Sequence, residues 1–329
     1  MKKIVMFDPS YSTINMGDFI ISDSINREMK SIIDDSFVLR ISTHMPISKF
    51  LQNFRKNYIS EFCKDADYKF ICGTNIFNSN LLHVFPNFNI NINDIHNYKN
   101  SIAIGCGCSE MDKSANLYTK FIYKKILSKE YFHSTRDEKT KQFLNELGFK
   151  AINTGCATMW GLNKEFCQHI PQRKAKNVIF TLTDYCIDRE RDQFLIDFLN
   201  QEYEKVFFWI QGSEDLNYLK SLKNTEKIVL VPPNLESYIH VLKDYDIDYI
   251  GTRLHAGIFA LQNLVRTLII IVDNRARDIK ETYNIPAIER TELEEKITKI
   301  INNDICTDIN LDEEAINEWK KQFIEKRKK

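Results

Sequence analysis

The sequence predicts an α/β protein of two domains, each containing a mostly parallel sheet. The chain has 329 residues, of which 43% are hydrophobic and 27% charged, so it is long enough to bury two cores. Short apolar runs alternate with helix-compatible segments in two separate series. The alternation lapses between Gly155 and Lys176, which marks the connection between the domains.

Each series supplies the strands of one expected domain. The first series has apolar runs at residues 4–7, 37–41, 70–72, 102–105 and 132–135, and the second at residues 178–182, 206–210, 228–231, 247–250 and 268–272. Strands that alternate with helices favour parallel sheets. We expect an N-terminal Rossmann-like domain over residues 1–165 and a C-terminal Rossmann-like domain over 175–308. Residues 309–329 are expected to end in a helix that packs back on the first domain.

This arrangement, two Rossmann-like domains whose sheets face a central cleft, describes a GT-B-like architecture. Length and periodicity alone fit other two-domain α/β folds equally well, so the choice depends on particular residues.

The composition excludes several classes of protein. Lysine and arginine together number 45, as do aspartate and glutamate, so no net positive field is present to hold a nucleic acid. The 8 cysteines form no Cys-x-x-Cys pair and are expected to be reduced thiols. No metal site is expected. The apolar run after Met1 is too short for a signal peptide, which predicts a cytoplasmic protein.

The most informative segment runs from residue 250 to 278. A buried strand gives way to an apolar helix, and Arg253 and His255 lie at that junction. Ligands of open α/β sheets bind beyond the carboxyl ends of strands, where helix N–H groups attract phosphate or carboxylate. An anion site is the functional interpretation. The alternative is that Arg253 pairs with a carboxylate such as Asp248 while His255 caps its helix.

A second candidate follows the first strand. There Gly17 permits close approach of the backbone, and Asp18 is placed to cap the next helix. The alternative is an ordinary helix start with Asn15 in a turn.

Other residues follow strands in the same way. Arg136 lies just past the run at 132–135, where the alternative is an ion pair with Asp137 or Glu138. Gly73 and Thr74 and residues 105–108 also follow strands, and their backbone N–H groups could contact an anion. Residues 211–214 and 232–234 follow strands of the second domain, where Ser213 and Asn234 are expected to be ordinary helix caps that could also touch a substrate.

In chain order, four elements resemble the polysaccharide pyruvyl transferase family. They are Asn15-Met16-Gly17-Asp18, the Gly73 loop, Ser134-Thr135-Arg136-Asp137, and Gly251-Thr252-Arg253-Leu254-His255 leading to Val272-Asp273. The resemblance extends from about residue 4 to residue 278.

The resemblance implies a GT-B enzyme that moves an enolpyruvyl unit from phosphoenolpyruvate to a sugar hydroxyl and closes it into a ketal. By motif, Arg136 and Arg253 would hold the donor's anionic groups and His255 would transfer protons. Substrate contacts are likewise implied for Leu254, Asn15, Gly17, Asp18, Gly73 and Thr74. Planar guanidinium groups suit a phosphate and a carboxylate, and imidazole suits proton transfer near neutral pH. Neither a metal nor a cofactor is implied besides the donor.

The implied acceptor is a surface polysaccharide or its lipid-linked precursor. The basic run at residues 325–329 would allow peripheral contact with the inner face of an anionic membrane, with a solvated helix end as the alternative. Two rival functions are a GT-B glycosyltransferase that uses a nucleotide sugar and a non-catalytic scaffold in glycan assembly.

The chain departs from the family at Cys156, where an acid is usual, and at Asn274-Arg275-Ala276-Arg277, where a lysine is usual. Asn263-Leu264-Val265-Arg266 replaces a glycine and proline turn, a change expected to alter packing.

Overall fold

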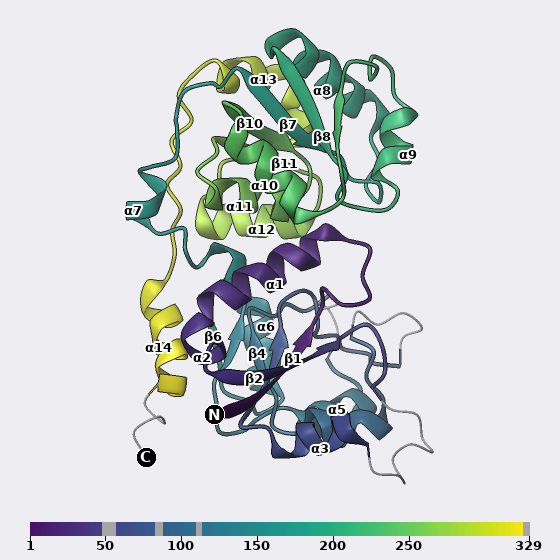
Figure 1. Ribbon diagram of the computed structural model, residues 1–329, viewed down its shortest axis with the longest axis vertical. Coiled ribbons are helices and arrows are strands. Elements are labelled where there is room, and N and C mark those ends of the chain that lie inside the picture. The colour runs from purple at the N-terminus through teal and green to yellow at the C-terminus, as the bar shows by residue number, and fades with distance from the viewer. Residues whose placement is uncertain (48–56, 83–87, 110–113, 325–329) are drawn as a thin grey trace. The chain divides into compact units, whose positions relative to one another are not determined.

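The chain folds into two compact units (Figure 1). The computed structural model describes residues 1–47, 57–82, 88–109 and 114–324. Unit 1 consists of Met1–Thr13, Ile21–Trp160 and Asp312–Lys329, and unit 2 of Ile14–Ile20 and Gly161–Leu311. The segment Ile14–Ile20 therefore groups with unit 2, although the sequence analysis places it in the first domain. One of the contacts that connect this segment to unit 2 is a hydrogen bond of 2.9 Å, in which the Met16 N–H donates to the Gln211 carbonyl.

Unit 1 is built on parallel strands. They are β1 (Lys2–Asp8), β2 (Ser36–Ser42), β3 (Tyr68–Cys72), β4 (Ile102–Ile104), β5 (His133–Thr135) and β6 (Ala151–Asn153). Among the described residues, the first four form a sheet in the order β2-β1-β3-β4, and β5 pairs with β6. The Ser134 hydroxyl accepts a 2.7 Å hydrogen bond from the Gly105 N–H, which brings β5 to the end of β4. The sequence analysis missed β6.

Helices cover the strands of unit 1. They are α1 (Met16–Glu28), α2 (Lys30–Ile33), α3 (Tyr58–Asp65), α4 (Ile95–Tyr98), α5 (Leu117–Ile126), α6 (Glu138–Glu146) and α14 (Glu313–Ile324), with 3-10 turns η2 (Ile92–Asp94) and η3 (Ala157–Met159). The C-terminal helix α14 buries Trp319, whose indole N–H donates to the Phe132 carbonyl at 2.8 Å. Trp319 also packs 5.6 Å, between ring centroids, from Trp160. The basic run at residues 325–329 lies outside the described residues.

Unit 2 contains a wider parallel sheet. Its strands are β7 (Asn177–Thr181), β8 (Lys205–Trp209), β9 (Val229–Val231), β10 (Ile247–Gly251), β11 (Thr267–Ile271) and β12 (Ala287–Glu289). Its helices are α7 (Lys164–Cys167), α8 (Arg189–Glu202), α9 (Asp215–Lys220), α10 (Leu235–Asp244), α11 (Leu254–Gln262), α12 (Asn274–Tyr283) and α13 (Leu293–Ile301), with η4 (Arg290–Glu292). The described strands are ordered β12-β11-β10-β7-β8-β9, which is the doubly wound Rossmann order. That order reverses between β7 and β10, the position where ligands of such sheets bind.

A buried ion pair supports the sheet of unit 2. The side chain of Arg266 is 2% exposed and donates to the Asp248 carboxylate at 2.7 Å. It also donates to the carbonyls of Gln172, Ile301 and Asn303 at 2.7–2.8 Å. Arg266 thus joins β10 and β11 to the segments before β7 and after α13.

A buried histidine supports unit 1. His133 in β5 accepts a hydrogen bond from the Ala103 N–H at Nδ1 (3.1 Å), so its Nε2 carries the proton and donates to the Ser128 carbonyl (2.9 Å). Burial lowers the pKa of His133 to about 4, and the bond to Ser128 opposes that shift only in part.

All eight cysteines lie among the described residues as thiols outside any disulfide, and six of them are buried. Within the described ranges, every helix is too short or too polar to span a bilayer.

We expect Arg266→Met to lower the free energy of unfolding by about 3–5 kcal/mol, because Asp248 would remain buried without its cation. Urea denaturation measures the change. The matched control is Arg277→Met, which breaks the more exposed Arg277–Glu289 pair and should cost less than about 1 kcal/mol. Equal losses in the two variants would contradict the structural role of Arg266.

Acid should destabilise unit 1 through His133. The folded state keeps this ring neutral down to about pH 4, whereas the unfolded chain protonates it near pH 6.5. Stability is therefore fully present above pH 6.5 and is lost as the pH falls toward 4, by about 3 kcal/mol. Urea denaturation as a function of pH should show a smaller acid-dependent loss in His133→Asn, whose overall stability is lower at pH 7. Equal pH slopes would rule out His133 as the source.

Candidate functional site

The candidate site of unit 2 lies at the carboxyl ends of β7 and β10, on either side of the reversal in strand order. β10 ends at Gly251, where a Cβ atom would lie 2.6–2.9 Å from atoms of Thr181. Only glycine therefore lets the two strand ends pack this closely. Arg253 follows directly and is the N-cap residue of α11.

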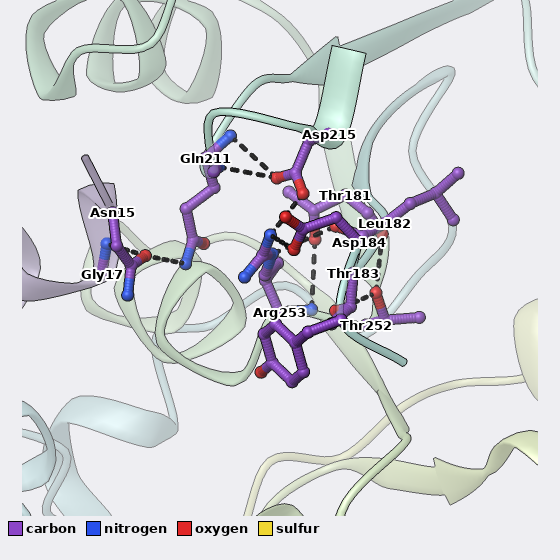
Figure 2. Close-up of polar contacts among 12 residues, drawn as sticks. Asn15, Gly17, Thr181, Leu182, Thr183, Asp184, Gln211, Asp215, Thr252 and Arg253 are labelled. Carbon is purple, nitrogen blue, oxygen red and sulfur yellow. Dashed lines mark hydrogen bonds and ion pairs between the residues drawn. The ribbon is translucent and has the colours of Figure 1, made fainter. Parts of the chain in front are cut away.

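Arg253 is held from several directions (Figure 2). Its side chain is 6% exposed. Nε donates to the Leu182 carbonyl at 3.1 Å, and Nη2 donates to Asp184 at 2.8 Å and to the carboxylate of Asp215. The Tyr185 ring covers the guanidinium at 5.2 Å. Nη1 makes no hydrogen bond to any part of the chain that the structure describes.

Asp215 is the buried partner of Arg253. It is the first residue of α9, and its carboxylate accepts hydrogen bonds from the N–H groups of Gln211 (3.2 Å) and Gly212 (2.7 Å). Burial raises the pKa of Asp215, and the charge of Arg253 opposes that shift. Burial by itself would lower the pKa of Arg253. The charge of Asp215 and its hydrogen bond to the guanidinium have a larger effect together, so the pKa of Arg253 is raised. The arginine is therefore charged at all physiological pH values.

Gly212 makes room for this pair. A Cβ atom at this position would lie 2.5 Å from Nη2 of Arg253 and 3.2 Å from the Asp215 carboxylate. The backbone after β8 therefore approaches the guanidinium as closely as a glycine allows.

His255 lies beside the segment that begins α1. A Cβ atom on Gly17 would lie 3.4 Å from Nδ1 of His255, 3.1 Å from Nε2 of Gln211 and 3.2 Å from Oδ1 of Asn15. Asn15 Oδ1 accepts from the Gly17 N–H (3.0 Å) and from the Gln211 amide (3.2 Å), as Figure 2 shows. Gln211 Oε1 is buried and accepts no hydrogen bond from any residue that the structure describes. Together these residues form a polar group beside the start of α11.

The rest of α11 is apolar and anchors the two polar residues. Leu254 and residues 256–261 are buried. The Tyr249 hydroxyl donates to the Arg253 carbonyl at 2.9 Å and contacts the Thr181 hydroxyl at 2.7 Å. Leu254 is thus a packing residue at the helix start, and α11 presents its first N–H groups at the strand ends.

Unit 1 has a separate group at the carboxyl ends of β3, β4 and β5. Arg136 is 8% exposed, and a Cβ atom on Gly107 would lie 2.4 Å from its Nε, so this side chain lies against Gly107. The Gly107 N–H donates to the Thr74 carbonyl at 2.8 Å. Gly73 and Thr74 both have positive φ, +54° and +53°, which forms the tight turn after β3.

The structure thus brings together Asn15, Gly17, Arg253, Leu254 and His255 within unit 2. Gly73, Thr74 and Arg136 form the second group, within unit 1. Asp18 does not cap α1, because that helix begins at Met16 and places Asp18 in its first turn. The side chain that accepts a terminal N–H is that of Asn15.

The structure also bears on the alternative interpretation of Arg253 and Arg136, in which each arginine forms an ion pair. Arg253 does pair with carboxylates, but with Asp184 and Asp215 instead of Asp248, which pairs with Arg266. Arg136 contacts Asp137 at 3.4 Å.

Sequence reasoning missed Asp184, Tyr185 and Asp215. The signal that could have found them is their position, since each follows the end of β7 or β8 by a few residues.

In the described part of the chain, no group of three or more His, Cys, Asp or Glu side chains is placed to hold a metal ion.

Solved structures similar to this chain share its fold. UDP-GlcNAc 2-epimerase from Methanocaldococcus jannaschii superposes with a TM-score of 0.53 at 12% identity, covering 98% of this chain and 100% of that chain. The S. aureus MnaA–UDP co-structure gives a TM-score of 0.51 at 9% identity, covering 99% of this chain and 97% of that chain. At such identities the likeness shows the fold alone, which is α/β and GT-B-like. A comparison with curated proteins gives no match.

The sequence model of one family, described as polysaccharide pyruvyl transferase, matches residues 15–274. That range begins at Asn15 and includes Arg136, Arg253 and His255. Because the match covers most of the chain and contains both groups of candidate residues, the protein belongs to the polysaccharide pyruvyl transferase family.

Proposed function

We propose that this protein transfers a pyruvyl group from phosphoenolpyruvate to a sugar of a surface polysaccharide or its lipid-linked precursor. The observation that carries the proposal is the position of Arg253 and His255. Both lie where the strand order of unit 2 reverses, at the start of α11, in a member of this family. Oriented N–H groups and a fixed cation at that position suit a small anionic donor.

Arg253 is proposed to bind the donor through Nη1. Its other polar atoms are engaged by Leu182, Asp184 and Asp215, so the guanidinium is fixed in direction before a ligand arrives. A preorganised donor of hydrogen bonds binds an anion at lower entropic cost than a mobile one.

The two carboxylates have different proposed roles. Asp215 is completely buried and orients Arg253, whereas the side chain of Asp184 is 25% exposed. With both carboxylates ionised, the cluster around Arg253 carries a net negative charge, which opposes an anionic donor. We therefore propose that the hydrogen bond between Asp184 and the Arg253 guanidinium breaks when the donor binds, so that the donor takes the place of Asp184.

The proposed reaction forms a ketal and releases inorganic phosphate. The methylene carbon of the donor gains a proton and becomes a methyl group, while one sugar hydroxyl loses its proton and bonds to the adjacent carbon. A second hydroxyl then bonds to that carbon and loses its proton, while the carbon–oxygen bond to phosphate breaks and phosphate leaves with that proton. His255 is the proposed proton carrier, because an imidazole can both accept and donate a proton in general acid–base catalysis.

Arg136 is proposed as a second donor-binding arginine on the strength of its motif. Its guanidinium lies against the bare backbone of Gly107, at the carboxyl edge of unit 1, in the space that a side chain at position 107 would fill. Neither arginine is proposed to carry protons, since a guanidinium stays charged throughout the physiological range.

The deciding experiment supplies purified protein with phosphoenolpyruvate and candidate acceptor glycans. Release of inorganic phosphate together with a product heavier by one ketal-linked pyruvyl group is the expected result. Release of a nucleotide from a nucleotide sugar would instead support a glycosyltransferase. No turnover of either donor, with folding intact, would favour the scaffold function.

We expect His255→Ala to reduce kcat by about 100-fold or more, because general acid–base catalysis contributes on that scale. Circular dichroism should show an unchanged fold, and the KM for phosphoenolpyruvate should change little. Unchanged kcat in this variant would remove His255 from the chemistry.

Asp184→Asn and Asp215→Asn should change donor affinity in opposite directions. Removing the exchangeable charge at Asp184 should lower the KM for phosphoenolpyruvate about fivefold, equivalent to about 1 kcal/mol. Removing the charge at Asp215 should raise that KM about tenfold or more, because Arg253 loses its orienting partner. The control is Glu214→Gln, which removes an exposed charge beside Asp215 and should leave KM unchanged. A rise of KM in Asp184→Asn would show that Asp184 also orients the arginine.

A further inference from the structure

Unit 1 has a cavity of about 360 Å³ at the edge of its sheet that lies opposite its candidate site residues. Its lining includes Tyr68 and Ile102, the first residues of β3 and β4, so it opens at the amino edge of the sheet. Gly73 and Thr74 follow the carboxyl end of β3, at the opposite edge. The family resemblance and the proposed chemistry use none of the residues that line this cavity.

Lys69 gives the cavity an unusual feature. It is the second residue of β3 and only 6% exposed. Lysine is almost never buried to this extent unless it is paired. Yet among the described residues its ammonium group makes no hydrogen bond and no ion pair.

The direction of the Lys69 side chain follows from strand alternation. Tyr68 and Phe70 pack into one core cluster, whereas Ile71 packs into the cluster on the other face of the sheet, which also contains Cys63 of α3. Lys69 therefore points to the Cys63 face. Burial raises the pKa of the Cys63 thiol to about 11, so at neutral pH this neighbour is uncharged.

The charges around the cavity are predominantly positive. Three lysines, Lys64, Lys69 and Lys99, line it against the two carboxyl groups of Asp67 and Glu130. The Asp67 carboxylate already has a hydrogen-bond partner, because it accepts a bond of 2.8 Å from the backbone N–H of Lys3. Lys64 and Lys99, like Lys69, form no ion pair with any described residue.

The pKa of Lys69 agrees with this lack of a counter-charge. Burial lowers the pKa of Lys69, and the ammonium of Lys99 lowers it further, whereas Cys63 would raise it only as a thiolate, the form that it does not take at neutral pH. No carboxylate contributes to that balance. A buried cation next to another cation is costly unless an anion neutralises both.

We propose that this cavity binds the phosphate group of a second ligand, with Lys69 at its base and Lys64 and Lys99 at its rim. Lysines act as point charges that suit phosphate, and the multiple negative charges of a phosphate ester would neutralise several ammonium groups at once. The volume is near the lower end of the range for small-molecule sites, which fits a ligand of sugar-phosphate size. The phosphate could belong to a soluble ester or to a lipid headgroup. This site is independent of the proposed pyruvyl transfer.

Calorimetric titration of the whole protein with inorganic pyrophosphate tests the proposal. We expect Lys69→Met to weaken pyrophosphate binding about 10- to 100-fold, the loss typical of a charge-assisted hydrogen bond. Lys99→Met should weaken it less. The matched control is Lys124→Met, an exposed lysine of α5 outside the cavity, which should bind as the wild type does.

Two further measurements locate the ligand. In NMR spectra of lysine-labelled protein, pyrophosphate should shift the side-chain signal that Lys69→Met removes. In parallel, co-sedimentation with phosphatidylcholine vesicles containing phosphatidic acid tests the lipid source. Pyrophosphate binding that depends on Lys69 supports a soluble ester, and vesicle binding alone that depends on Lys69 supports a headgroup. If neither pyrophosphate nor the vesicles bind in a way that Lys69→Met weakens, or if pyrophosphate binds without shifting the Lys69 signal, the proposal is wrong, and Lys69 simply extends its ammonium into solvent within the cavity.

Discussion

The site of unit 2 depends on one interaction, the buried pair of Arg253 and Asp215. An isolated charge at either position would be strongly disfavoured, so each residue requires the other. Asp215 is in turn fixed by backbone N–H groups of the turn after β8, and Arg253 by the Leu182 carbonyl after β7. The pair therefore links three strand ends, and the start of α11 with His255 is placed relative to all three.

Unit 2 contains a second buried arginine pair, and the comparison is informative. Arg266 uses Nε, Nη1 and Nη2 in bonds to Asp248 and three carbonyls, so each of its three guanidinium nitrogens has a partner in the protein. Arg253 leaves Nη1 without a partner among the described residues. Both side chains are nearly inaccessible, but of the two only Arg253 has a guanidinium nitrogen that makes no hydrogen bond to the described residues. Burial alone does not distinguish a structural arginine from one that binds a ligand. Counting which guanidinium nitrogens already have hydrogen-bond partners does distinguish them.

Much of the fold could be predicted because periodicity reports burial directly. All ten predicted strands overlap strands of the structure, and the long apolar runs at β1, β7, β10 and β11 gave the clearest signals. The two described strands that were missed, β6 and β12, each end in a polar residue and bury only one of their three residues, so no apolar run marks them. Likewise, the first turn of α1 groups with unit 2 through contacts with Gln211, which no local pattern encodes.

The candidate site was predictable in its cations but not in their partners. Arg136, Arg253 and His255 follow strands, and that position is visible in the sequence. The carboxylates that hold Arg253 lie 69 and 38 residues before it, and proximity in sequence favoured Asp248 instead. Arg266 shows the same limit, because its partners before β7 and after α13 come together only in the folded sheet.

Gly212 has a consequence for how function can be lost in such proteins. The smallest possible side chain at this position would occupy space within 2.5 Å of the Arg253 guanidinium. A single added methyl group would thus disturb the arginine while every ionisable residue stayed in place and the isoelectric point did not move. Relatives that have lost this arrangement are therefore to be recognised by the bulk of one residue in the β8–α9 turn, even where the Arg-Leu-His sequence is intact.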